Sequence, residues 1–159
     1  MMNVIYYIKY VLAYFKGAES MNLSYREQSI WGSLAITLIV YGYYFATVFS
    51  GAQPSQIDRT ALARLIGAVF VIVVIEIAYH ILIALKSKVE PKDERDILIE
   101  TKAYRNSYLL LVADLFMLMG TVVVFGLTPL LTVNLMLLSV VISEIVKYLT
   151  QLFLYRRGI

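Results

Sequence analysis

Three carboxylates stand inside long apolar stretches of this chain, at similar distances from the same predicted side of a membrane. They are Glu76, Asp114 and Glu144. If the stretches are helices that cross a bilayer, each carboxylate lies about nine to eleven residues, or about 13 to 17 Å, from one end of its helix. A charged group at such a depth costs about 2.5 to 3.5 kcal/mol. We therefore expect these side chains to face protein, water, an ion or one another.

Basic side chains share a helix face with two of the carboxylates. His80 follows Glu76 by four residues, and Lys147 follows Glu144 by three, spacings that place each pair on one side of a helix. Asp114 would need a partner from another helix, and Lys147 is the economical partner for it or for a carboxylate of the second stretch. Two interpretations stay open. The groups fix helix packing within a bundle or between subunits, or they form a proton or cation pathway in which His80 relays protons.

Catalytic and metal chemistry are less well supported by the residue types. Glu, His and Asp side chains could hold a divalent metal, but one histidine and no cysteine make a poor ligand set for a transition metal. The absence of cysteine also excludes disulfides and thiol catalysis. The chain has no nucleophile elbow, phosphate-binding glycine loop or zincin helix. We predict no cofactor, and an intramembrane enzyme is the least favoured function.

Four apolar segments must position these groups, and each is long enough to cross a bilayer. Of 159 residues, 60% are hydrophobic and only 16% are charged, which is far more apolar surface than a soluble domain of this size can bury. A span needs about 20 residues. The fold class predicted is all-α, a polytopic membrane protein with four transmembrane helices in residues 21–159. The predicted spans are residues 29–49, 61–85, 107–127 and 130–155.

The distribution of Lys and Arg predicts the orientation of the spans. Only Arg59 and Arg64 flank the connection between the first two spans. The other side is much more basic, which favours cytoplasmic termini and a cytoplasmic central segment. Its basic residues are Lys9, Lys16, Arg26, Lys86, Lys88, Lys92, Arg95, Lys102, Arg105, Arg156 and Arg157. The net charge of +3 is too small and scattered for a nucleic-acid surface.

Residues 1–20 form a separate segment, apolar and tyrosine-rich from Val4 to Phe15 but interrupted by Lys9. Twelve residues are too few to span a membrane. Tyrosines and lysines in this pattern are typical of an amphipathic helix that lies along the membrane interface. A partner-binding or oligomerising element is the alternative.

The central segment, residues 87–106, resembles a motif more than any other part of the chain. Pro91 suits the first turn of a helix, and the acidic residues after it then meet the positive end of the helix dipole. We expect this helix to continue directly into the third span. It is either a solvated, capped extension or a cluster that binds a hard cation or a basic protein partner. The motif residues are Asp93, Glu94, Arg95, Asp96 and Lys102.

The run Asp93-Glu94-Arg95-Asp96, followed by Ile99, by Lys102-Ala103 and by Ser107 at the head of an apolar span, resembles the signature of a family of small prokaryotic integral-membrane proteins. That family is four-helical and has no established activity. The resemblance covers the central segment and the third span. It implies a bacterial or archaeal cell (inner) membrane, and it carries over no catalytic residue.

Three functional classes are compatible with these features of the sequence. The favoured one is a regulatory, immunity-type or accessory subunit that uses its cytoplasmic segment to meet a protein partner, with the buried polar groups as structural contacts. The second is an oligomeric proton- or cation-coupled transporter or channel that uses Glu76, His80, Asp114, Glu144 and Lys147. Four helices leave little room for a pore, so a homo-oligomer is expected. The third is an intramembrane enzyme.

Overall fold

The described part of the chain consists of long helices and the short segments that cap them. A computed structural model describes residues 24–51, 58–86 and 91–157. The helices are α2 (Tyr25–Ser50), α3 (Arg59–Lys86), α4 (Glu94–Phe125) and α5 (Pro129–Arg157). All four are long and apolar enough to cross a membrane, and the described residues contain no strand. The predicted all-α class with four membrane-length helices is confirmed. The predicted interfacial helix, residues 1–20, lies outside the described residues.

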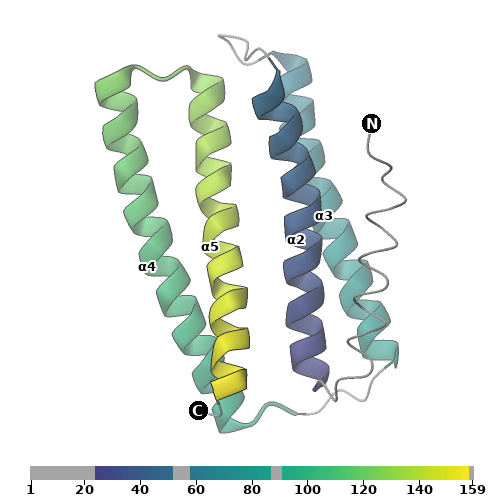
Figure 1. Cartoon of the computed structure of the whole chain (residues 1–159). Helices are drawn as coiled ribbons and strands as arrows, with labels where there is room; N and C mark the ends of the chain where they lie inside the picture. The colour runs from purple at the N-terminus through teal and green to yellow at the C-terminus, as the bar shows by residue number, and fades with distance from the viewer. Residues whose placement is uncertain (1–23, 52–57, 87–90, 158–159) are drawn as a thin grey trace.

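Two helical hairpins stand side by side (Figure 1). Helix α2 packs on α3 in the first hairpin, α4 packs on α5 in the second, and α2 packs on α5 between them. The middle of the molecule is therefore formed by α2 and α5, with α3 and α4 on their outer sides. The beginning of α4 and the end of α5 lie at the same end of the molecule, which we call the charged end because Arg95, Arg156 and Arg157 lie there.

The helix ends follow local rules of the sequence. Ser24 and Glu27 form a capping box at the start of α2, and Asp93 and Asp96 form one at the start of α4. Helix α4 begins at Glu94, so the predicted start at Pro91 is wrong, because the Asp93 side chain caps the helix instead. From there α4 continues unbroken into its apolar part, as expected.

Gly126 ends α4 in the left-handed region, with φ of 62°. This conformation favours glycine because a side chain would clash with the backbone. Pro129 then begins α5, where its missing N–H costs nothing. Two residues with opposite backbone preferences thus form the sharp turn of the second hairpin.

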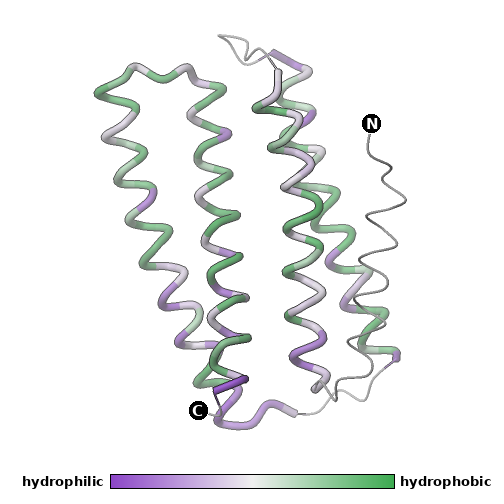
Figure 2. The backbone as a smooth tube through the Cα atoms, viewed as in Figure 1, coloured by the Kyte–Doolittle hydropathy of each residue, from purple (hydrophilic) through white to green (hydrophobic). Residues whose placement is uncertain are grey.

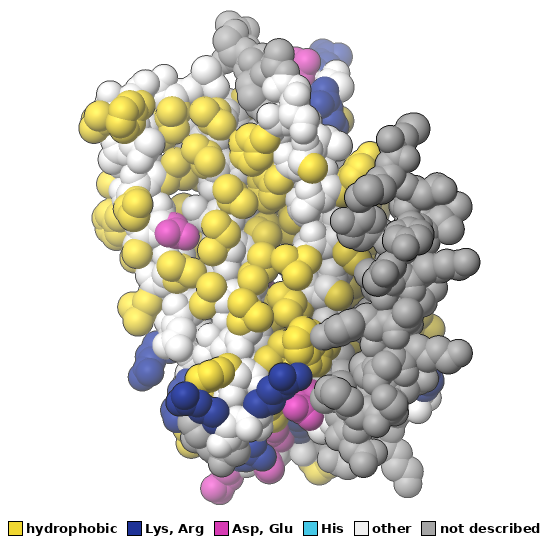
Figure 3. All heavy atoms as spheres, viewed as in Figure 1, with side chains coloured by type: hydrophobic (Ala, Val, Ile, Leu, Met, Phe, Trp, Pro, Cys, Tyr) yellow, Lys and Arg dark blue, Asp and Glu magenta, His cyan; other side chains and the backbone are white. Residues whose placement is uncertain are grey.

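On the face shown, hydrophobic side chains cover most of the middle of the bundle, and most of the charged side chains lie at its ends (Figure 3). The hydropathy of the residues along the helices follows the same pattern (Figure 2). Within its most apolar stretch, α2 buries 33% of its residues, α3 11% and α4 none. The outer helices therefore offer wide apolar surfaces to lipid or to other membrane helices.

Far from the charged end, one buried hydrogen bond joins the two hairpins. The Tyr44 hydroxyl of α2 donates to Oδ1 of Asn134 on α5 at 2.6 Å. Asn134 is 1% exposed and also donates to the Leu130 carbonyl at 2.9 Å. Both polar groups are thereby satisfied within the apolar interior.

Candidate functional site

A group of polar side chains at the α2–α3 contact is centred on Glu76 and His80. The Ser33 hydroxyl donates a hydrogen bond to Oε2 of Glu76 at 2.8 Å. Nε2 of His80 lies 3.3 Å from that carboxylate oxygen and 3.3 Å from Oγ of Ser33. Nδ1 of His80 lies 3.4 Å from Oγ of Ser29. Because Glu76 and His80 are one turn apart on α3, two serines one turn apart on α2 reach both of them.

Gly32 allows α3 to approach α2 closely beside these groups. A Cβ atom at this position would lie 1.9 Å from the hydroxyl oxygen of Tyr79, so the tyrosine ring occupies the space that a side chain would need. The Tyr79 hydroxyl donates to the carbonyl of Gln28 at 2.8 Å. The glycine and the tyrosine together set the separation at which Ser33 can reach Glu76.

A second group of polar side chains lies on α5. Glu144 and Lys147 form an ion pair with each other. Nζ of Lys147 also lies 4.7 Å from the centre of the Tyr148 ring and 5.2 Å from that of the Tyr104 ring on α4, distances at which cation–π attraction operates. The Tyr148 hydroxyl lies beside Ser33 and Glu144, so it connects the two groups. We call Ser33, Glu76, His80, Glu144, Lys147 and Tyr148 the inner polar cluster.

The predicted pairing of Lys147 with Asp114 or with a carboxylate of α3 differs from the structure. Lys147 pairs with Glu144, since a spacing of three residues already brings the two together on one helix face. Asp114 lies half-buried on α4, in line with the buried residues Ser107 and Leu118. Within the described ranges, no hydrogen bond or ion pair involves Asp114. Four of the five predicted intramembrane residues thus come together, and Asp114 stands apart.

The inner polar cluster has the composition of an acid–base site. Oε1 of Glu76 is buried and has no hydrogen-bond partner among the described residues. A buried oxygen without a partner is unfavourable, and a proton or a bound cation would remove this cost. No group of three potential metal ligands from His, Cys, Asp or Glu occurs in the part of the chain that the structure describes.

A three-helix junction at the charged end is centred on Asp96. Oδ2 of Asp96 on α4 lies 3.0 Å from Nε of Arg26 on α2, and Oδ1 accepts a hydrogen bond from the Tyr155 hydroxyl of α5 at 2.7 Å. Burial acts to raise the pKa of Asp96, but hydrogen bonds with Tyr155 and Asp93 and the charge of Arg26 outweigh it and lower the pKa below its usual value. The carboxylate therefore stays charged and joins three helices.

The other residues of the central motif have different positions. Asp93 caps α4. The Arg95 guanidinium donates to the Tyr155 carbonyl at 3.1 Å and lies 5.9 Å from the centre of that ring. Glu94 is exposed in the first turn, and Lys102 lines an open groove further along α4. The two aspartates of the motif thus serve helix capping and the contact between the hairpins.

Sequence reasoning missed three residues that complete these sites. Ser33 has no neighbour in the sequence that marks it as a partner of Glu76, because the pairing depends on the rotation of two helices. Tyr148 follows Lys147 directly, but its role depends on the approach of α2 to α5. Tyr155 ends the fourth predicted span, where an interfacial aromatic residue is expected for other reasons. Nothing further in the sequence therefore indicates its hydrogen bond to Asp96.

The described geometry combines an acid–base cluster between the hairpins, a carboxylate apart from it on α4, and an ionic junction at the charged end. These features depend on contacts between helices. No protein-family model, curated protein or solved structure matches the chain.

Proposed function

We propose that the protein is a regulatory or accessory subunit of a membrane assembly, without catalytic activity of its own, and that α4 carries the contact with the next subunit. The observation that supports this is Asp114. It lies in the apolar part of α4, half-buried, and makes no hydrogen bond or ion pair with any described residue. A carboxylate in that environment costs about 2.5 to 3.5 kcal/mol. A donor from another membrane helix would offset this cost.

Asp114 lies between the buried side of α4 and its exposed face, and this exposed face suits close packing of a second helix. Ala113 and Gly120, seven residues apart, are both exposed, and a Cβ atom at Gly120 would meet nothing within 4 Å. Met117 and Val124, on the same side, are 73% and 74% exposed. Small residues at such spacing let helix backbones approach in a membrane, where packing and hydrogen bonds drive association.

The proposed location is the cell membrane of a bacterium or archaeon, with the charged end in the cytoplasm. The excess of Lys and Arg at that end supports this orientation, since only Arg59 and Arg64 lie at the other. Asp93 and Asp96 are engaged within the fold. The membrane face of α4 is therefore a better candidate for the subunit contact than the acidic residues of the central motif.

Cysteine cross-linking in membranes tests this proposal, because the chain contains no cysteine of its own. We expect Met117→Cys to form disulfide-linked dimers under mild oxidation, since the partner helix in the simplest assembly belongs to a second copy. Adding Asp114→Leu should reduce the dimer fraction several-fold, because the buried polar contact would be lost. Ile66→Cys, on the exposed face of α3 at 57% exposure, is the matched control.

Equal cross-linking of the two cysteine variants would mean random collision in the membrane and would overturn the assignment of α4. A dimer fraction that does not respond to Asp114→Leu would show that this carboxylate is not part of the contact. Light scattering of the purified protein in detergent gives the number of copies independently.

A proton- or cation-linked activity is the second candidate, and the inner polar cluster favours it. Glu76, His80 and Glu144 belong to one connected set of side chains that crosses from α3 to α5, and Oε1 of Glu76 has no partner among the described residues. Flux measured in liposomes with purified protein tests this candidate. Glu76→Gln should abolish flux, whereas Asp114→Asn should leave it unchanged because Asp114 stands apart from the cluster. Absence of wild-type flux would reject the candidate.

A further inference from the structure

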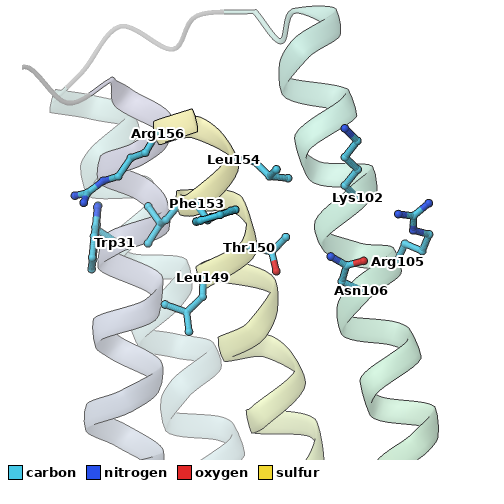
Figure 4. A pocket seen from close by; sticks show the side chains of 10 residues that line it. Trp31, Lys102, Arg105, Asn106, Leu149, Thr150, Phe153, Leu154 and Arg156 are labelled. Atoms are coloured by element: carbon cyan, nitrogen blue, oxygen red, sulfur yellow. The ribbon is translucent and has the colours of Figure 1, made fainter. Parts of the chain in front are cut away.

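An open groove lies near the charged end, with α5 as its floor and residues of α2 and α4 at its sides (Figure 4). Leu149 and Phe153 give the floor an apolar surface, and both are exposed, at 49% and 54%. Trp31 of α2 lines one side, and Lys102 of α4 lines the other. The groove therefore combines an apolar floor with polar sides.

Basic side chains line this groove without any acidic residue among them. Lys102 and Arg105 lie three residues apart on α4, and Arg156 lies 5.7 Å over the ring of Trp31. Within the described residues, no carboxylate pairs with Lys102 or Arg105.

The two carboxylates that most closely precede Lys102 on α4 are already engaged elsewhere. Glu100 pairs with Lys92 at 2.6 Å, and Asp96 pairs with Arg26 at 3.0 Å. The positive charge of the groove is thus not neutralised by the charged groups described around it. It is available for an anion.

The position of the groove along the helices indicates the kind of anion. Lys102 and Arg105 just precede the predicted third span, Arg156 just follows the fourth, and Leu149 lies deeper. In the proposed orientation, the cations lie at the cytoplasmic surface of the bilayer and the apolar floor extends towards its interior. Anionic lipids attract positive side chains to that surface. Each Lys or Arg contributes about 1 kcal/mol to this attraction.

We propose that this groove binds an anionic phospholipid, with its phosphate group at Lys102 and Arg105 and an acyl chain along Leu149 and Phe153. A free phosphate ion has no apolar part that could contact the apolar floor of the groove.

The chain's own amino-terminal segment is a poorer occupant. Residues 1–23 contain Lys9 and Lys16 and a single acidic residue, Glu19. The like charges of the two lysines oppose docking in a basic groove. The proposal rests on the membrane placement of the helices and does not depend on assembly through Asp114.

The single tryptophan of the chain lines the groove and reports on its occupant. We would reconstitute the full chain in vesicles and measure quenching of Trp31 fluorescence by phosphatidylglycerol with a spin label high on the acyl chain. Phosphatidylcholine with the same label is the reference lipid. Quenching should be stronger with the anionic lipid, and Lys102→Gln with Arg105→Gln should lower the lipid preference about fivefold for each charge removed.

Arg59→Gln with Arg64→Gln is the matched control, because it removes two charges at the opposite end of the helices. This control should keep the lipid preference, and so should Asp114→Asn.

Equal quenching by the two lipids would overturn the proposal, as would equal loss of preference in the control. Release of the lipid by inorganic phosphate would show that the groove binds phosphate alone. Protection of Trp31 from every labelled lipid in dimers would assign the groove to a second copy. The unfolding midpoint of each variant checks that it is folded.

Discussion

The hydrogen bond from Tyr155 to Asp96 is the residue-scale contact with the clearest consequence. Its acceptor is the charged carboxylate of Asp96, whose side chain is only 11% exposed. Hydrogen bonds to charged groups contribute about 1.5 to 3 kcal/mol, so Tyr155→Phe should lower the free energy of unfolding by about that amount. Thermal unfolding in detergent measures the change. Tyr43→Phe, at a position 74% exposed, is the control and should leave the midpoint unchanged.

The same carboxylate predicts a pH dependence of stability. The pKa of Asp96 is lower in the folded protein than in the unfolded chain, so the folded state binds this proton more weakly. The stabilisation is complete above the usual pKa of about 3.9 and is lost as the pH falls through the lowered value. Asp96→Asn keeps the size of the side chain but cannot titrate. Wild type should unfold at a higher temperature than Asp96→Asn near neutral pH, and the two midpoints should converge below about pH 4. A difference that persists in acid would contradict this assignment.

At the scale of elements, the α2–α3 hairpin depends on the glycine at its contact. Gly32→Ala places a methyl group where the Tyr79 ring lies. The ring must move, which breaks its hydrogen bond to Gln28 and separates Ser33 from Glu76. Overpacking of this kind costs about 1 to 3 kcal/mol. We therefore expect a lower unfolding midpoint, and a larger loss for Gly32→Leu.

Gly42→Ala is the matched control for this substitution because it lies in the same helix with nothing within 4 Å of an added Cβ atom. Alanine is the better helix former by about 1 kcal/mol, so this variant should be as stable as wild type or more stable. If both glycine variants lost stability equally, the effect would belong to the helix itself and not to the contact with Tyr79.

At the scale of the whole molecule, the two hairpins are joined through α2 and α5 and through the Asp96 junction. Residues 1–88 and 89–159, expressed together as separate chains, should therefore co-purify. Interhelical hydrogen bonds in membranes contribute only about 0.6 kcal/mol each on average, so Tyr44→Phe alone should change the yield little. Combining it with Asp96→Asn should lower the yield clearly. If the two unmodified halves did not co-purify, the connecting segment would be what holds the hairpins together.

The fold was predictable from local features, and the candidate site only in part. Length and hydropathy predict four membrane-length helices, and the spacing of Glu76 with His80 predicts their common face. The partner of Lys147 was not predictable in the same way. Depth along a helix places Asp114 and Lys147 in the same layer, but it does not say which way each helix is turned. The structure pairs Lys147 with Glu144 and leaves Asp114 apart.

The sequence by itself determined the elements, because helix capping, turn formation and burial in a bilayer depend on residues close together in the chain. The Asp93 cap, the Gly126 turn and the apolar spans are of this kind. Only the tertiary structure decided that Ser33 meets Glu76 and that Arg26 meets Asp96. Those contacts depend on the rotation and separation of helices, which many side chains far apart in the sequence set together.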